Sequence, residues 1–166
     1  TISRRQRQMC IRDRYNLPKV MSVQNPYSLL NRSYEVGLAE ISIREKCGLL
    51  AYSPLAFGML TGKYDDGKKP EKARLTLYAN MYTRYTKEKG IKYSRKLNKL
   101  ARESGITPTQ MALGFVNSRP FVTSNIIGAT NIDQLNENIK TFDIELGEDL
   151  LEKIEEIHDE CPFPCP

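Results

Sequence analysis

Three short apolar runs, each followed by turn-forming residues, predict three β-strands. They cover residues 19–24, 49–52 and 123–127. Apolar runs of this length, without strict alternation of apolar and polar residues, are typical of buried strands in a parallel sheet. The second strand must end before Pro54, because proline has no N–H to donate to a sheet ladder.

Helical periodicity fills the segments between and after these runs. The first expected helix has Ser33 as a candidate N-cap and ends at Gly48, where a terminating glycine is common. Gly37 lies inside it and weakens the pattern. The expected helices cover residues 34–47, 87–104, 108–118, a segment that begins at 131, and 146–160.

The later helices have the clearest start signals. Thr107 and Gln110 form a capping box with Pro108 at the first helical position. Asn131, with Gln134 three residues later, begins the next helix. Apolar residues recur at helical spacing on faces expected to point inward: Ile132, Leu135 and Ile139 in that helix, and Leu150, Leu151, Ile154 and Ile157 in the last one.

Strands that alternate with helices predict right-handed crossovers and a parallel sheet, and therefore an α/β fold. The three strands finish near Gln24, Tyr52 and Gly128, in polar, aromatic or turn-forming residues. Because ligands bind at the carboxyl ends of parallel strands, we expect the three ends to share one site. No G-x-G-x-x-G follows any of the strands, which disfavours a Rossmann half.

One stretch, LLAYSPLAFGMLTGKY at residues 49–64, combines a tyrosine ring, a hydroxyl, two glycines and Lys63. These groups suit a phosphate-bearing ligand, although an ordinary strand and turn also fits the pattern. The polar segment at residues 65–80 is predicted to be a long loop, which in a compact domain is commonly a functional lid.

The net charge of +5 belongs mainly to one short segment. Five arginines against one aspartate give residues 1–14 a charge of +4, which leaves +1 for the other 152 residues. The segment has no apolar period and cannot build a core. It fits a nucleic-acid arm or a targeting peptide, but the run RQRQMCIRDR is closer to translated sequencing adapter. We therefore set residues 1–16 apart from a domain at 17–166.

The remaining composition argues against several classes of function. The four cysteines form no C-x-x-C pair and His158 is the only histidine, which disfavours a zinc site. His158 is predicted to lie on the surface, and Cys161 and Cys165 are predicted to be free thiols. No apolar run approaches transmembrane length, so no membrane partner is expected. Free thiols are typical of a reducing cytoplasm.

Three motifs resemble the C-terminal half of an aldo-keto reductase, in a branch that includes bacterial and plant oxidoreductases and potassium-channel beta subunits. They are VQNPYSLLNR (23–32), LLAYSPLAFGMLTGKY (49–64) and NIIGATNIDQLNENI (125–139). The resemblance runs from about residue 17 to the end of the chain. It implies a (β/α)8 TIM barrel, of which the three strands would be the sixth, seventh and eighth, and it implies NADP(H) as the cofactor.

The resemblance also implies a role for individual residues. Gln24 would hydrogen-bond the nicotinamide carboxamide, and Tyr52 would stack on the nicotinamide ring. Lys63 would neutralise the pyrophosphate, and Arg74 would fold over the 2′-phosphate side. The other implied contacts are Ser53, Pro54, Leu55, Ala56 and Phe57 along the pyrophosphate, and Gly128, Thr130, Gln134, Glu137 and Asn138 at the adenosine end.

The helix that begins after Asn131 would turn its free N–H groups toward a phosphate. The alternative is that Thr130 and Gln134 only cap this helix.

The family's catalytic Asp, Tyr, Lys and His lie in its N-terminal half, so the resemblance implies no catalytic residue in this chain. Three strands cannot close a barrel. We therefore expect the chain alone to be unstable or to aggregate, and to bind nucleotide poorly without the N-terminal half-barrel as its partner.

The whole protein would reduce small aldehydes or ketones to alcohols with NADPH. The alternative is a regulatory NADP-binding subunit that senses redox state. A nucleic-acid binder that uses the N-terminal arginines is a third hypothesis, disfavoured because no aromatic platform accompanies them. The sequence identifies neither the substrate nor the oligomeric state.

Overall fold

The sheet contains three parallel strands, in the order β1-β2-β3. The structure is a computed structural model, and it describes residues 11–78, 81 and 83–165. The strands are β1 (Ser22–Pro26), β2 (Gly48–Tyr52) and β3 (Val122–Ile126). Both strand pairs are parallel, so the predicted α/β class and strand direction are confirmed.

Helices connect the strands and follow them, with η denoting a 3₁₀ helix. None of the helices in the described ranges has the length and apolar content needed to cross a membrane. A short helix covers residues 11–15. The others are η1 (Ser33–Val36), α2 (Leu38–Glu45), η2 (Ala56–Thr61), η3 (Asp65–Gly67), α3 (Arg74–Leu77), α4 (Thr83–Thr86), α5 (Glu88–Glu103), α6 (Pro108–Asn117), α7 (Ile132–Lys140), η4 (Thr141–Asp143) and α8 (Glu148–Glu160).

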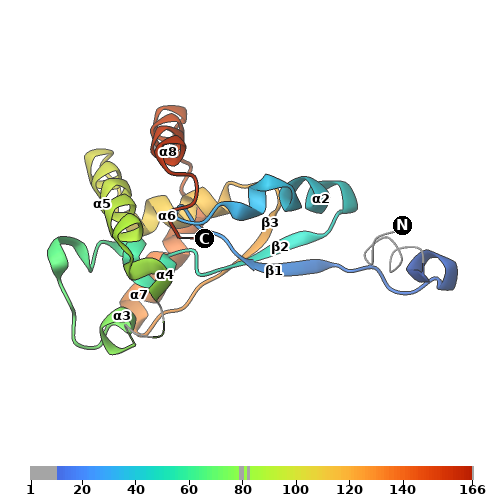
Figure 1. The fold of residues 1–166 in the computed structure, drawn as a ribbon, viewed down its shortest axis with the longest axis horizontal. Coiled ribbons are helices and arrows are strands. Elements are labelled where there is room, and N and C mark those ends of the chain that lie inside the picture. The colour runs from blue at the N-terminus through green and yellow to red at the C-terminus, as the bar shows by residue number, and fades with distance from the viewer. Residues whose placement is uncertain (1–10, 79–80, 82, 166) are drawn as a thin grey trace.

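Among the described residues, helices cover one face of the sheet, and Figure 1 shows α2, α6 and α8 on the same side of the strands. Leu49 and Ala51 point to that side and are fully buried. Gln24 and Tyr52 point to the opposite side, because side chains alternate along a strand, and both are exposed. The sheet therefore has one packed face and one bare face.

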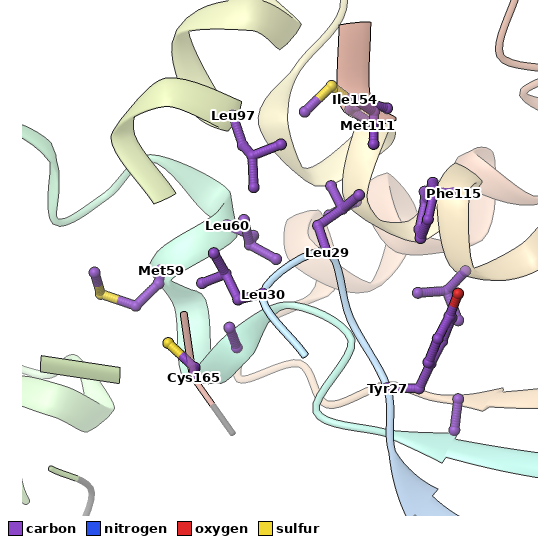
Figure 2. Packing of buried hydrophobic residues seen from close by; sticks show 14 of the residues in the cluster. Tyr27, Leu29, Leu30, Met59, Leu60, Leu97, Met111, Phe115, Ile154 and Cys165 are labelled. Carbon is purple, nitrogen blue, oxygen red and sulfur yellow. The ribbon is translucent and has the colours of Figure 1, made fainter. Parts of the chain in front are cut away.

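The core lies between the covered face and the helices. Tyr27 and Leu30, which follow β1, are fully buried, and the Tyr27 ring stacks on Phe115 of α6 with centroids 6.3 Å apart. Figure 2 shows Leu29 and Leu30 in the middle of this cluster, near Cys165 from the C-terminal tail. Burying each such side chain contributes about 1.5–3 kcal/mol to stability.

The start signals of the later helices are confirmed. The Thr107 hydroxyl accepts a hydrogen bond from the Gln110 N–H at 3.1 Å, and the Gln110 side chain accepts one from the Thr107 N–H at 2.8 Å. The Asn131 side chain caps α7 by accepting from the Gln134 N–H at 2.9 Å. The ranges of α5, α6 and α8 agree with prediction to within a few residues.

The single helix predicted over residues 34–47 was wrong. Gly37, with φ of 157°, separates η1 from α2, so the chain changes direction there. Ser33 lies inside η1 and is not a side-chain cap. The helix ends at Lys46, which adopts the left-handed conformation, and Gly48 begins β2. A Cβ at position 48 would overlap the Thr123 side chain, so Gly48 is needed for close strand packing.

The segment predicted as a loop at 65–80 contains two short helices, η3 and α3. Its last two residues, 79 and 80, lie outside the described residues. Asp65 is buried although the residues that follow it are exposed, because its carboxylate binds α5. The polar composition of this segment gave no sign that Asp65 is buried against α5.

The inward direction predicted for the apolar face of α7 was also wrong. This face, the α7 stripe, is exposed: Ile132 by 69%, Leu135 by 38%, Ile139 by 58% and the following Phe142 by 80%. Within the described part of the chain no element covers it. The helix is amphipathic, but its apolar side faces away from the core.

We predict that the chain self-associates through this stripe, because large exposed apolar patches drive association. Replacing Ile132 and Ile139 by glutamine should shift sedimentation velocity profiles toward the monomer without changing helix content. Asp133→Glu, which alters an exposed position on another side of α7, is the control. Unchanged association in the double variant would contradict the prediction.

We predict that Thr107→Ala lowers the free energy of unfolding by about 1 kcal/mol, because it removes the N-cap of α6. Thr107→Ser keeps the hydroxyl and should lose much less. Urea unfolding followed by circular dichroism measures both. Equal losses in the two variants would show that the hydroxyl is not the stabilising group.

Candidate functional site

The three strand ends meet at one edge of the sheet, as their order predicted. Pro26 pairs with Tyr52, and Tyr52 pairs with Ile126. Figure 1 shows α3, α4 and the beginning of α7 gathered beyond this edge. The bare face and the carboxyl edge together form the candidate site.

Gln24 and Tyr52 share the bare face. Gln24 pairs with Leu50, which is two residues before Tyr52, so all three side chains point the same way. Tyr52 is 37% exposed. The Gln24 amide makes no side-chain hydrogen bond with any described residue. A free amide beside an exposed aromatic ring can bind and orient a flat polar ring.

The segment after β2 has an unusual backbone. Ser53, Ala56 and Phe57 have φ of 57°, 48° and 56°, and Gly58 follows with φ of 96°. The left-handed region is unfavourable for residues with a Cβ, at about 1–3 kcal/mol each, and such residues cluster at functional sites. Pro54 and Ala56 are buried and Leu55 is half-buried, so the segment is held by packing.

Lys63 folds back over this segment. A Cβ on Gly58 would lie 2.7 Å from Lys63 Nζ, so only glycine leaves room for the ammonium group. Nζ lies 5.3 Å from the centre of the Tyr64 ring. Burial, followed by the nearby charge of Arg74, lowers the pKa of Lys63.

Arg74, the first residue of α3, is the second cation of this group. Its Cζ atom lies 5.1 Å from the centre of the Phe57 ring. Neither Arg74 nor Lys63 forms an ion pair with a carboxylate of the described residues. Two neighbouring cations without a carboxylate partner favour the binding of an anion such as a phosphate.

The residues predicted for the adenosine end already have partners within the chain. Gln134 Oε1 accepts from both the N–H and the hydroxyl of Thr130, at 3.0 Å each. Glu137 accepts from the Thr107 hydroxyl at 3.0 Å, and Asn138 is buried. The bonds between Gln134 and Thr130 are those expected if these two residues only cap the helix. Gly128 is exposed, and a Cβ there would meet no atom within 4 Å.

Two residues of the 49–64 motif were given no individual role at the sequence level. Gly58 lies within the recognised motif, but only its φ and its closeness to Lys63 show its role. Tyr64 supports the Lys63 ammonium with its ring, and its hydroxyl accepts from the Leu75 N–H at 3.1 Å. Tyr64 therefore links the Lys63 turn to α3, which carries Arg74.

Other candidate chemistry is weaker. The described residues contain no group of three or more His, Cys, Asp or Glu side chains placed to hold a metal ion. His158 is half-buried against the Phe163 ring, so the surface prediction was only partly right, and burial lowers its pKa. Cys161 and Cys165 are free thiols, as predicted. Burial raises the pKa of Cys165 to about 12, which makes it a poor nucleophile.

The arrangement fits a dinucleotide better at one end than at the other. The Lys63–Arg74 pair and the Gly58 backbone suit phosphates, and the bare face beside Gln24 and Tyr52 suits a flat ring. At the adenosine end Gln134 would have to exchange its Thr130 contacts for the ligand. No described residue at the edge forms an acid–base pair that would protonate a substrate oxygen.

Comparison with known proteins agrees with the resemblance seen in the motifs. The family model that matches residues 4–159 is the aldo/keto reductase family, so the match begins within the arginine-rich segment. "Protein tas" of Escherichia coli (strain K12) is 49% identical over 160 residues, which are 96% of this chain and 46% of that protein. The chain therefore spans slightly less than half the length of this relative.

Two further relatives carry functional names. A "putative voltage-gated potassium channel subunit beta" of Schizosaccharomyces pombe is 34% identical over 154 residues, 89% of this chain and 44% of that protein. "L-glyceraldehyde 3-phosphate reductase" of Escherichia coli (strain K12) is 36% identical over 124 residues, 72% of this chain and 36% of that protein. The length of the family match and the identity to these relatives agree with the fold and with the three strand-end motifs. This chain belongs to the aldo/keto reductase family.

Proposed function

We propose that this chain supplies the cofactor-binding part of an NADPH-dependent oxidoreductase that reduces small aldehydes or ketones to alcohols. The observation that carries the proposal is the Lys63–Arg74 pair, two cations without a carboxylate partner among the described residues, above a strained backbone at the carboxyl edge. Strained backbone persists where packing enforces it and function requires it.

The residues of the site would hold NADPH as follows. Lys63 and the backbone of residues 53–58 bind the pyrophosphate, and Arg74 closes over the 2′-phosphate. Gln24 orients the carboxamide while the exposed Tyr52 ring supports the nicotinamide. Bound NADPH supplies the hydride that reduces the carbonyl carbon. The chain's own contribution is to bind the cofactor and fix which ring face meets the substrate.

The bare sheet face supports a second element of the proposal, a half-barrel partner. Parallel sheets are normally covered on both faces. A partner with further parallel strands would cover Gln24 and Tyr52, and its helices would pack on the α7 stripe. In a closed barrel β1, β2 and β3 would be the sixth, seventh and eighth strands. The partner would also supply the acid that protonates the carbonyl oxygen.

A regulatory NADP-binding subunit is the second candidate function, because relatives named as potassium channel beta subunits are about as similar to this chain as the named reductase. The same phosphate site would serve both functions. The discriminating feature lies in the partner half, where an intact Asp, Tyr, Lys and His set favours the enzyme.

The test uses a hybrid protein, in which the part of Protein tas outside the 160 matched residues is joined ahead of this chain. We expect the hybrid to bind NADPH and to consume it with an aromatic aldehyde, and the chain alone to bind poorly. Gly58→Ala should weaken NADPH binding by about tenfold, because a Cβ displaces Lys63.

Gly67→Ala is the matched control, since Gly67 also has positive φ, 76°, but no atom lies within 4 Å of its Cβ position. A hybrid that folds but binds no NADPH would contradict the proposal. A tight, NADPH-selective titration of the chain alone would contradict the need for a partner half.

We predict that the affinity of the hybrid for NADPH falls as pH rises through the pKa of Lys63. Burial and Arg74 lower this pKa in the free site, and a bound phosphate raises it again because it favours the ammonium form. Affinity is therefore highest below the pKa of the free site, and its loss begins below the usual lysine range. Fluorescence titrations across pH measure this. Lys63→Arg keeps the charge and should flatten the profile, whereas an unchanged profile would show that Lys63 does not titrate with binding.

A further inference from the structure

Asp65 anchors the turn that carries Lys63 to the neighbouring helix α5. Asp65 is buried, with only 8% of its surface exposed. One carboxylate oxygen accepts a hydrogen bond from Asn98 Nδ2 at 2.9 Å, and the other accepts from the Arg102 guanidinium at 2.6 Å. A buried carboxylate is costly unless it is paired in this way. The Asp65 N–H donates to the Gly62 carbonyl at 3.1 Å, which closes the turn around Lys63.

Asn98 holds both ends of the loop that contains the site. Its side chain is fully buried, and Nδ2 donates to the Met59 carbonyl at 2.9 Å as well as to Asp65. Met59 directly follows Gly58, and Asp65 is two residues after Lys63. One amide group therefore fixes the distance between the glycine and the lysine that lies over it.

Three successive residues of this turn contact three different parts of the structure. Lys63 faces the strained segment, Tyr64 reaches Leu75 in α3, and Asp65 faces α5. Gly62 also contributes, because a Cβ there would overlap the Arg102 side chain. The side-chain hydrogen bonds that join this turn to α5 come from Asn98 and Arg102, so the direction of the Lys63 side chain depends on Asp65 and its partners.

We propose that Asn98 and Asp65 are positioning residues that hold the Lys63 ammonium above Gly58 for phosphate binding. The proposal rests on the phosphate site proposed above. Neither residue touches the ligand, and both act through Lys63. Arg102 shares this anchoring role, because its guanidinium is the cationic partner of the buried Asp65 carboxylate.

The test measures acylation of individual lysines in the full chain by mass spectrometry, with and without millimolar NADPH. Exposed Lys99, with 75% of its side chain accessible, is the reference in the same sample. Asn98→Ala should raise the rate at Lys63 relative to Lys99 by about tenfold, because the turn opens locally. It should also weaken the protection of Lys63 by NADPH. Arg95→Met, the control at an exposed position of the same helix, should change both by less than about threefold.

A second arm follows NADPH binding by fluorescence in four versions of the hybrid protein: unsubstituted, Asn98→Ala, Lys63→Met and the double variant. If Asn98 acts through Lys63, its replacement weakens binding by about tenfold in the unsubstituted hybrid and by less than about twofold in Lys63→Met. Equal losses in both backgrounds would show a general structural role and overturn the proposal. So would an unchanged labelling rate at Lys63.

Circular dichroism checks that each variant is folded. If Asn98→Ala does not fold, Asp65→Asn takes its place, since it keeps the side-chain volume and removes the carboxylate. If the hybrid protein binds no NADPH, the proposed function fails. The labelling rate without nucleotide then decides by itself whether Asn98 and Asp65 hold Lys63 in place.

Discussion

A parallel sheet needs cover on both faces, and this chain provides it on one. The strands β1, β2 and β3 pack Leu49 and Ala51 against helices, while Gln24 and Tyr52 on the other face stay exposed. Any partner or ligand of the chain must accommodate that asymmetry.

The candidate site depends on the same asymmetry and on strain. Ser53, Ala56 and Phe57, between β2 and Lys63, adopt left-handed conformations that cost about 1–3 kcal/mol each. Packing of Pro54 and Ala56 on one side, and the bonds of Asn98 on the other, hold this backbone in place. The result is a short rigid edge with two cations above it. Such an edge suits a phosphate because its charges are positioned before the ligand arrives.

Much of the fold could be predicted because its signals are local. The capping box at Thr107 and the Asn131 cap depend only on neighbouring residues, and the parallel order follows from strands that alternate with helices. The motifs around Gln24, Tyr52 and Lys63 also indicated the edge where the site lies. The predictions were wrong where the role or burial of a residue depends on a contact with a residue distant in the sequence. Gly48 makes room for Thr123 instead of ending a helix, and Asp65 is buried against α5 within a segment that looks like a solvated loop.

The sequence by itself determined the α/β class, most of the helix starts, the family and the residues at each strand end. These depend on periodicity, on capping within four residues and on motifs that are continuous in the chain. Only the tertiary structure decided that the α7 stripe faces outward and that Asn98 joins Met59 to Asp65. The reason is physical: burial and hydrogen bonding between residues more than thirty positions apart depend on how elements pack, and no local pattern encodes that contact.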